Sequence, residues 1–379
     1  MSTPDLSARV RRALDAVIDP EIRRPITELD MVGDITEPHA GTVDVEIRLT
    51  IVGCPAARTI EADVRAAVEA VDGVENARIA VGVMSDEQRR ALTERLRGAR
   101  RVMPFGPDSL TRVIAVTSGK GGVGKSTVTA NLAVALAARG LRVGLIDADV
   151  HGFSIPGLLG LVDADGRTPA PTRVGELILP PVAYDVKTIS IGMFLDDPRQ
   201  AVAWRGPMLH RTIEQFLRDV HFGDLDVLLL DLPPGTGDIA ISIGQLLPHA
   251  EVVVVTTPQR AAADVAERSA RVARQTGQRV VGVIENMSAF RASDGSLVDL
   301  FGSGGGADVA ARLSADGDSV PVLASVPLST ALRTGGDDGI PVVLAAPEDP
   351  ASIALNTAAD ALAGRGRGLS GRPLGVALR

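Results

Sequence analysis

The sequence predicts an α/β fold, in which a mostly parallel β-sheet is covered by helices on both faces and preceded by a small α+β domain. Short apolar runs without polar alternation recur after residue 111, and helical segments separate most of them. Strands that are apolar on both faces are typical of parallel sheets covered on both sides. A glycine-rich stretch directly follows the first of these runs, which predicts a phosphate-binding loop after the first strand.

The composition narrows the class of protein. The chain has 379 residues, which favours two domains, and its 45% hydrophobic and 23% charged residues are ordinary for a globular protein. A net charge of -8 argues against a general nucleic-acid binder, and no apolar run is long enough to span a bilayer. The single cysteine excludes an intrachain disulfide and fits a reducing compartment. We therefore expect a cytoplasmic protein with neither a nucleic-acid nor a membrane partner.

The first 98 residues predict the small α+β domain. Leu6, Val10 and Leu14 recur at helical spacing, and Asp19-Pro20 ends that pattern. Ser85 is the expected N-cap of the last helix. The expected elements are, in order, a helix at 5–18, two strands within 31–50 joined at 39–41, a helix opened by Cys54-Pro55 and ending near 71, a strand at 74–83 and a helix at 85–98.

The rest of the chain predicts the larger domain. Residues 99–111 are expected to be a linker, residues 112–365 the α/β domain, and the Gly-rich residues 366–379 a flexible basic tail. The expected strands are 112–118, 141–149, 187–193, 225–233, 250–258, 279–287 and 320–328.

Residues 119–126 fit the phosphate-loop pattern G-x-x-x-x-G-K-S, between an expected strand and an expected helix. Glycines let backbone N–H groups approach phosphates, and the following helix adds its positive end. Lys125 would reach the β- and γ-phosphates of ATP, Ser126 would ligate Mg²⁺, and Thr127 would contact the α-phosphate. The expected nucleotide contacts are Gly119, Lys120, Gly121, Gly122, Val123, Gly124, Lys125, Ser126 and Thr127.

Lys120 is a second lysine in this loop, and it lies too early to fold back easily onto its own nucleotide. One interpretation is a solvated surface lysine. The other is a cation that projects into the nucleotide of a second subunit and neutralises transition-state charge there, as an arginine finger does.

Three aspartates follow expected strands. Because ligands of open parallel sheets bind at the carboxyl ends of strands, Asp147, Asp149 and Asp231 can converge on the phosphate loop. Asp231 follows four hydrophobic residues, as in a Walker B motif that holds Mg²⁺. Asp149 is the candidate for orienting the attacking water. For Asp147, support of Mg²⁺ and structural capping stay equally open, and capping is the alternative for Asp149 as well. The segment "GTGD" after Asp231 resembles a mobile loop that senses the γ-phosphate.

The segment "SGKGGVGKST" resembles the deviant Walker A motif of MinD/ParA-like P-loop ATPases. Together with "DADVHG", "WRGPML", "LLLDLPPGTGD" and "ENMS", it resembles the Mrp-type iron–sulfur cluster carrier ATPases. The N-terminal "IDPEI" and "LTIVGCPAA" are similar to a small domain shared with iron–sulfur assembly factors. The resemblance implies a homodimeric P-loop ATPase that passes clusters to apoproteins, with Lys120 contacting nucleotide across the interface and Asn286 at the adenine base.

One position departs from that family. Its members carry C-x-x-C shortly after the "NMS" tripeptide, and two subunits then supply four thiolates to a bridging cluster. In this chain Arg291, Ala292, Ser293 and Asp294 stand in that place. The usual cysteine ligands are therefore missing.

Cys54 is the one remaining thiol. It is either a small buried hydrophobe or a thiolate at a helix N-terminus, where the helix dipole lowers the pKa. The resemblance favours a reactive cysteine in this small domain, and a cluster on two Cys54 residues of a dimer would need other ligands besides.

Three functions fit these residues. The first is an ATP-dependent iron–sulfur carrier or assembly factor without the usual C-x-x-C. The second is a dimeric ATPase switch that acts on protein clients and holds no metal. The third, an ATPase that positions itself on DNA or membrane, is disfavoured by the negative charge.

Overall fold

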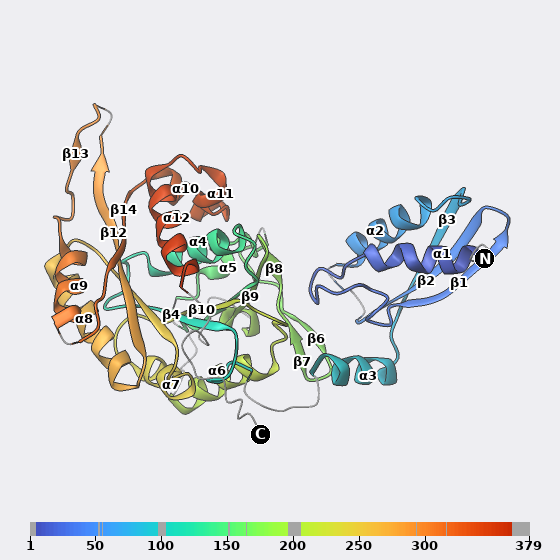
Figure 1. The fold of residues 1–379 in the computed structure, drawn as a ribbon, viewed down its shortest axis with the longest axis horizontal. Coiled ribbons are helices and arrows are strands. Elements are labelled where there is room, and N and C mark those ends of the chain that lie inside the picture. Colours follow the sequence, from blue (N-terminus) through green and yellow to red (C-terminus); the bar gives the residue numbers. More distant parts are fainter. Residues whose placement is uncertain are drawn as a thin grey trace, which may run out of the picture. The chain divides into compact units, whose positions relative to one another are not determined.

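The structure is a computed structural model and describes residues 5–51, 54, 56–97, 104–150, 152–163, 165–195, 206–292, 294–315 and 317–365 (Figure 1). The chain forms two compact units. The small unit comprises residues 1–101 with segments 171–182 and 219–223, and the large unit comprises residues 102–170, 183–218 and 224–379. Part of the expected linker, 99–103, and the expected tail, 366–379, lie outside the described residues.

The small unit has the expected order of helices and strands. Its elements are α1 (Leu6–Ala13), a 3₁₀ turn (Leu14–Ala16), β1 (Val32–His39), β2 (Thr42–Leu49), α2 (Ala57–Glu69), β3 (Asn76–Val83) and α3 (Asp86–Arg97). Strand β2 is central, antiparallel to β1 and parallel to β3. A hairpin of β6 (Thr172–Val174) and β7 (Leu177–Leu179) also belongs to this unit, although it comes from far along the chain.

Local hydrogen bonds explain where two of these helices, α3 and α2, begin. The Ser85 hydroxyl accepts from the Gln88 N–H at 3.2 Å, and the Gln88 side chain accepts from the Ser85 N–H at 2.8 Å. This reciprocal capping box confirms Ser85 as the N-cap of α3. Helix α2 begins at Ala57, later than expected, and the Ala57 N–H donates to the carbonyl of Cys54. Cys54 therefore precedes the helix.

The large unit is built on the parallel sheet that the apolar runs predict, and all seven expected strands form. They are β4 (Arg112–Ser118), β5 (Val143–Asp147), β9 (Val186–Ser190), β10 (Val227–Asp231), β11 (Glu251–Thr256), β12 (Arg279–Arg291) and β14 (Val322–Leu328). Their spatial order is β14-β12-β11-β4-β10-β5-β9, with every neighbouring pair parallel. Two short strands, β8 (Val182–Ala183) and β13 (Leu297–Val298), extend this sheet at its edges.

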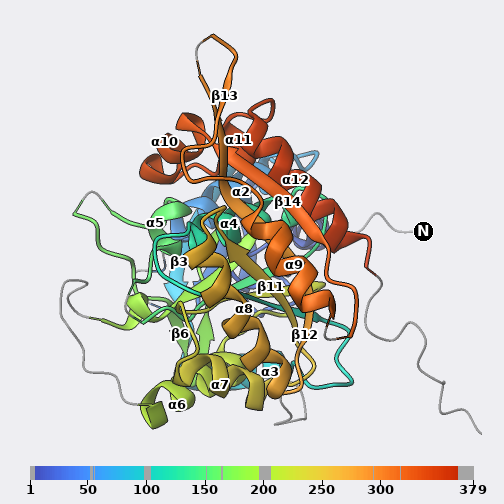
Figure 2. The ribbon, with the colours of Figure 1, turned by 90° about the vertical axis from the view of Figure 1, so that its left-hand side faces the viewer.

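Helices connect these strands. They are α4 (Lys125–Ala137), α5 (Ile155–Leu158), a 3₁₀ turn (Ile191–Phe194), α6 (Gly206–Asp219), α7 (Asp238–Leu246), α8 (Arg260–Gln275), α9 (Gly305–Ala315), α10 (Thr330–Asp338), α11 (Val342–Ala345) and α12 (Pro350–Ala363). Helix α4 packs with α12, whereas α8 packs with α7 and α9 (Figures 1 and 2). Among the described residues, no helix has both the length and the apolarity needed to cross a membrane.

The order of the strands positions the site. Strand β10 lies between β4 and β5, and Asp231 at its end is in register with Val116 of β4 and with Asp147 of β5. The phosphate loop leaves the end of β4 at the same edge of the sheet. The predicted acidic residues and the loop therefore meet at the carboxyl ends of neighbouring strands.

Candidate functional site

The predicted phosphate loop connects buried strand β4 to helix α4, in the context that the motif requires. Gly122 and Gly124 have φ angles of 79° and 78°, a left-handed conformation that side chains disfavour. Gly119 is needed for space, because a Cβ there would lie 2.2 Å from the backbone nitrogen of Ala266 in α8. The glycines thus allow both the turn and its close packing on α8.

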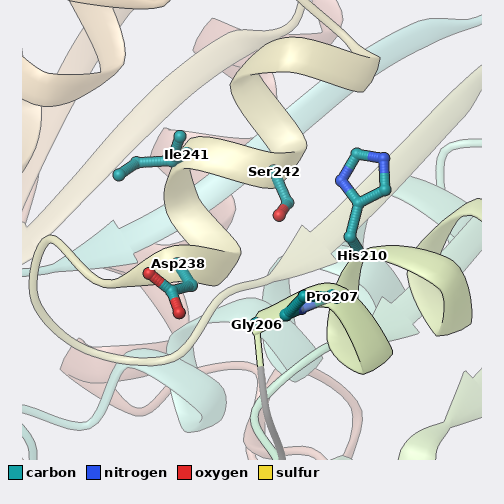
Figure 3. Close-up of a pocket in the computed structure, with 6 residues that line it drawn as sticks. All are labelled: Gly206, Pro207, His210, Asp238, Ile241 and Ser242. Carbon is teal, nitrogen blue, oxygen red and sulfur yellow. The ribbon is translucent and has the colours of Figure 1, made fainter.

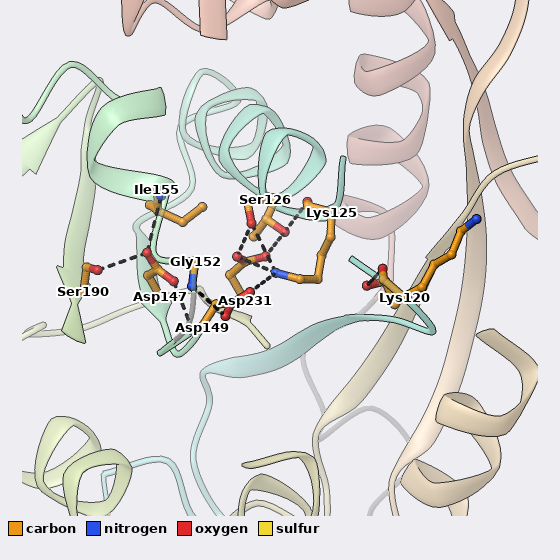
Figure 4. A network of polar contacts seen from close by, with 11 residues as sticks. Lys120, Lys125, Ser126, Asp147, Asp149, Gly152, Ile155, Ser190 and Asp231 are labelled. Atoms are coloured by element: carbon orange, nitrogen blue, oxygen red, sulfur yellow. Dashed lines mark hydrogen bonds and ion pairs between the residues drawn. The ribbon is translucent and has the colours of Figure 1, made fainter. Parts of the chain in front are cut away.

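Asp231 is the centre of a buried polar cluster (Figure 4). Its Oδ2 lies 2.7 Å from Lys125 Nζ and accepts from the Ser126 hydroxyl at 2.6 Å. Its Oδ1 accepts from the Thr129 hydroxyl at 2.8 Å. The Asp231 side chain is fully buried, and that of Lys125 is 6% exposed. The structure therefore joins the Walker A lysine and serine to the predicted Walker B carboxylate.

Asp147 lies on the neighbouring strand and organises the loop that follows it. Its carboxylate accepts from the Ser190 hydroxyl at 3.0 Å and from the backbone N–H groups of Asp149 and Ile155 at 3.2 and 3.3 Å. Ile155 opens α5, so the capping interpretation describes these contacts. Complete burial, reinforced by the nearby charge of Asp231, holds the pKa of Asp147 well above its ordinary value.

Asp149 faces the same cluster from the loop after β5. Its Oδ2 lies 3.9 Å from Lys125 Nζ, and its Oδ1 accepts from the Gly152 N–H at 3.2 Å. The side chain is 10% exposed, so it lies at the border between the cluster and solvent. That position suits a group that contacts a bound phosphate or water beside Lys125.

Lys120 takes a different direction. Its side chain extends away from Lys125 and Asp231 (Figure 4), and its Nζ donates to the amide oxygen of Gln259 at 2.9 Å. Gln259 is the residue directly before α8. In this structure Lys120 therefore takes no part in the cluster around Asp231.

Asn286 reaches the phosphate loop from β12. Its side-chain N–H donates to the carbonyl of Val123 at 2.9 Å, and its amide nitrogen would clash with any Cβ at Gly124. Asn286 is buried, and the next residue, Met287, has a left-handed φ of 55°. These contacts place Asn286 against the loop backbone, and its predicted contact with adenine stays a prediction.

These residues fit a magnesium–nucleotide complex. Mg²⁺ in proteins is commonly held by one or two carboxylates together with substrate phosphates, rather than by a complete protein cage. The site offers the Asp231 carboxylate, the Ser126 hydroxyl and the Asp149 carboxylate beside a glycine-rich loop. Within the described part of the chain, no group of three or more Cys, His, Asp or Glu residues is arranged to hold a metal ion on its own.

The region where the family's C-x-x-C is expected forms a hairpin at the end of β12. Phe290 pairs with Val298 and Arg291 with Leu297, and the hairpin extends beyond the rest of the sheet (Figure 1). Asp294 accepts from the N–H and the hydroxyl of Ser296, which lowers the pKa of this carboxyl. Ser293 lies outside the described residues. The side chains of this turn supply no thiolate and do not fit a Cys₄ cluster site.

Cys54 lies in the core of the small unit and is 7% exposed. Burial is the main cause that raises the pKa of its thiol, and the charges of Glu21 and Asp19 raise it further, against N–H groups of Ala56 and Ala57 that lower it. Of the two interpretations of Cys54, this environment favours the small buried hydrophobe over the thiolate.

Two family-like motifs meet at a cavity of about 300 Å³ between the starts of α6 and α7 (Figure 3). A Cβ on Gly206 of "WRGPML" would lie 2.6 Å from a carboxylate oxygen of Asp238, the last residue of "GTGD". A side chain at position 206 would therefore displace the Asp238 carboxylate, and Trp204 and Arg205 lie outside the described residues. The lining residues are Gly206, Pro207, His210, Asp238, Ile241 and Ser242.

Comparison with known proteins identifies the family of the large unit. The family model described as ParA, the NUBPL iron-transfer P-loop NTPases, matches residues 109–363. The chain belongs to this NUBPL-type family. A second model, described as an iron–sulfur cluster assembly protein, matches residues 7–81. The predicted resemblance of both parts is therefore confirmed.

Curated relatives of this NUBPL-type NTPase extend over nearly its whole length. A protein of Mycobacterium tuberculosis named iron-sulfur cluster carrier protein is 56% identical over 98% of this chain and 97% of its own. A protein of Synechocystis with the same name is 40% identical over 94% and 96% of the two chains. A solved nucleotide-binding protein of Archaeoglobus fulgidus in complex with ADP is 35% identical, with a TM-score of 0.51 over 62% of this chain and 92% of that one.

Sequence reasoning missed three residues of this NUBPL-type site. Thr129 and Ser190 donate to Asp231 and Asp147, and Gln259 accepts from Lys120. Thr129 had a usable signal, because it lies one helical turn after Lys125 and so on the same face of α4. Ser190 is the last residue of β9 and Gln259 follows β11, and only the spatial order of the strands brings them to the site.

Proposed function

We propose that the chain is an ATP-binding and ATP-hydrolysing homodimer that carries iron–sulfur clusters and transfers them to apoproteins. The observation that carries this proposal is its similarity, over nearly the full length, to proteins named iron-sulfur cluster carrier protein. The ADP complex of the Archaeoglobus fulgidus relative supports the nucleotide part. We place this activity in the cytoplasm, with residues 1–98 as an assembly-type domain, a linker at 99–111, an ATPase domain at 112–365 and a basic tail beyond it.

The geometry supports a division of work among the residues of the phosphate site. The amides of the glycine loop and Lys125 would bind the phosphates of ATP, with Thr127 beside the α-phosphate and Asn286 toward the base. Ser126 and Asp231 would hold Mg²⁺, which would neutralise phosphate charge during transfer to water. Asp149 would orient the attacking water, because it lies at the solvent border of the cluster near Lys125. Asp147 would support the Asp149 loop through its bond to the Asp149 N–H.

In this proposal the iron–sulfur cluster is the cargo. The residues that would ligate it remain to be identified. A dimer of this chain contains two thiols, both of them Cys54, whereas the usual bridging cluster takes four. Either Cys54 holds the cluster with ligands from other residues or molecules, or the chain uses ATP to act on protein clients without a cluster of its own. The missing thiols in the β12–β13 hairpin are the observation that favours this second function.

Anaerobic reconstitution separates the two functions. The full chain would be incubated with ferrous iron, sulfide and a thiol reductant, and then desalted and examined by visible spectroscopy. A carrier shows charge-transfer absorption that Cys54→Ala reduces, and it activates an apo iron–sulfur protein in a transfer assay. Cys54→Ser is the matched control for size. A wild-type chain that binds no cluster and activates no apoprotein would contradict the carrier function and leave the client switch.

A further inference from the structure

Lysine is scarce in this chain. Lys and Arg together number 39, and only three of them are lysines: Lys120, Lys125 and Lys187. Lys125 and Lys187 are 6% and 5% exposed, whereas Lys120 is partly exposed. Lys120 is therefore the most exposed of the three lysines, and its surroundings can be followed by amine chemistry.

Its partner is Gln259, at a distance of 2.9 Å from Nζ to the amide oxygen. Gln259 is the N-cap residue of α8, and its backbone carbonyl accepts from the N–H groups of Ala262 and Ala263. Its side chain makes no capping bond to its own helix. The amide oxygen is therefore available for the lysine.

The backbone of the phosphate loop fixes where the lysine starts. Gly119 lies so close to α8 that no side chain fits between the loop and Ala266. The Ser118 hydroxyl donates to the carbonyl of Lys120 at 3.1 Å. The Thr117 hydroxyl also bonds the Ser269 hydroxyl of α8, at 2.8 Å. The first half of the loop is thus held on α8, and the Lys120 side chain extends to the start of that helix.

The electrostatics make this hold reversible. The acceptor is a neutral amide, which binds an ammonium more weakly than a carboxylate does. The contact also lies at the N-terminus of a 16-residue helix, where the helix dipole disfavours a cation. A triphosphate is a much stronger partner for the same ammonium. Gln259 therefore keeps Lys120 ordered without competing strongly against phosphate.

We propose that Gln259 is a positioning residue, which holds Lys120 against α8 in the nucleotide-free chain and releases it to the phosphates of a second copy when two ATP-loaded chains pair. The hold also keeps the ammonium away from the carboxylates around Lys125 in its own site. The first half of this proposal stands on the observed contact alone. The second half rests on the proposed homodimeric ATPase.

The hold is tested in the nucleotide-free full chain with two variants of similar size. Gln259→Met removes the acceptor, and Gln259→Glu replaces it with a carboxylate. Each protein is treated with limiting N-hydroxysuccinimidyl acetate, and acetylation is measured at each lysine by peptide mass spectrometry. Because the amine must leave its acceptor before it reacts, loss of the acceptor should speed acetylation of Lys120 by roughly two- to tenfold, the effect of one hydrogen bond. Gln259→Glu should slow it.

Lys125 and Lys187 are the internal references for this experiment. Both are buried and belong to other elements, α4 and β9, so their acetylation should be equal in the three proteins. Equal acetylation of Lys120 in the wild type and both variants would contradict the claim that Gln259 holds the Lys120 ammonium. This conclusion would not depend on whether the protein binds or hydrolyses ATP.

The release is tested by pairing and turnover. Sedimentation velocity with a non-hydrolysable ATP analogue should show weaker pairing for Gln259→Glu but not for Gln259→Met. The kcat for ATP hydrolysis should fall in the variant whose pairing is weaker. The affinity of the monomer for nucleotide should be the same in all three proteins. In a Lys120→Ala background, Gln259→Glu should have no further effect on pairing. A merely structural role predicts that both substitutions weaken pairing, and that result would overturn the proposal. A wild type that never pairs with ATP would contradict the proposed homodimer, while acetylation would still decide the hold.

Discussion

Lys125 and Asp231 form a buried ion pair, with Nζ and Oδ2 2.7 Å apart, at the point where the phosphate loop meets the end of β10. The hydroxyls of Ser126 and Thr129 bind the two oxygens of the same carboxylate. Asp231 is therefore the nearest partner of the Walker A lysine in this structure. ATP bound as proposed would replace part of this arrangement with contacts to phosphate and Mg²⁺.

Removal of one member of this pair should harm stability as well as function. Lys125→Ala should abolish nucleotide binding or turnover, and it should destabilise the nucleotide-free chain by about 3 kcal/mol, because it leaves a buried carboxylate without its cation. Lys125→Ala combined with Asp231→Asn removes both charges and should recover part of that loss. Thermal unfolding of the two variants and of the wild type measures the loss of stability and its partial recovery. A double variant less stable than Lys125→Ala would show that the charge pair is not the cause.

Lys120→Ala should separate binding from hydrolysis. Lys120 makes no contact with the Asp231 cluster, so each chain should still bind nucleotide with wild-type affinity. Hydrolysis and ATP-dependent pairing should be lost, because the ammonium that we expect to reach the second nucleotide is absent. Equilibrium binding of a fluorescent ATP analogue, steady-state turnover and sedimentation test the three properties on one preparation. Normal turnover in this variant would refute the role of Lys120 across the interface.

Asp149→Ala should bind ATP and hydrolyse it slowly. Orientation of a nucleophile by a side chain typically contributes about 10²- to 10⁴-fold to a rate, so kcat should fall by that range while nucleotide affinity changes little. Asp163, a carboxylate that caps an exposed turn outside the site, offers a control, and Asp163→Ala should keep wild-type turnover. If Asp149→Ala hydrolyses ATP at the wild-type rate, its contacts serve only the loop.

The sequence predicted the parallel sheet and the meeting of Lys125, Ser126 and Asp231, because motif and strand end are both readable along the chain. It did not predict that Ser190 would bind Asp147, because that contact depends on β9 lying next to β5 in space. The contact of Gln259 with Lys120 was missed for the same reason. Gln259 follows β11, and it reaches Lys120 only because β11 lies next to β4 in the sheet. Likewise, nothing local to residues 171–182 indicated that this hairpin belongs to the small unit. These are properties of strand order and long-range packing, which a single sequence does not encode locally.

The chemistry of Cys54 gives a prediction with a definite pH dependence. Burial together with the charges of Glu21 and Asp19 raises the pKa of its thiol. The folded chain therefore holds this proton more tightly than the unfolded chain, and the associated stability is lost as the pH rises from the ordinary value of about 8.5 toward the raised pKa. Alkylation by iodoacetamide needs the thiolate, so at pH 7.5 it should be slower than for a free thiol and should increase steeply above pH 8.5.

Glu21→Gln tests the cause of this shift. It removes one negative charge near Cys54 but keeps the size of the side chain and an oxygen that can accept from the Thr172 hydroxyl. The pKa of the thiol should fall, and alkylation at pH 7.5 should be faster than in wild type. Glu28→Gln is the control. Glu28 is not among the groups that shift the pKa of the Cys54 thiol, so this substitution should leave the alkylation rate unchanged. Thiol reactivity in Glu21→Gln equal to wild type at every pH would mean that the charge of Glu21 does not raise the pKa, whereas a faster rate would show that the "IDPEI" segment tunes this cysteine.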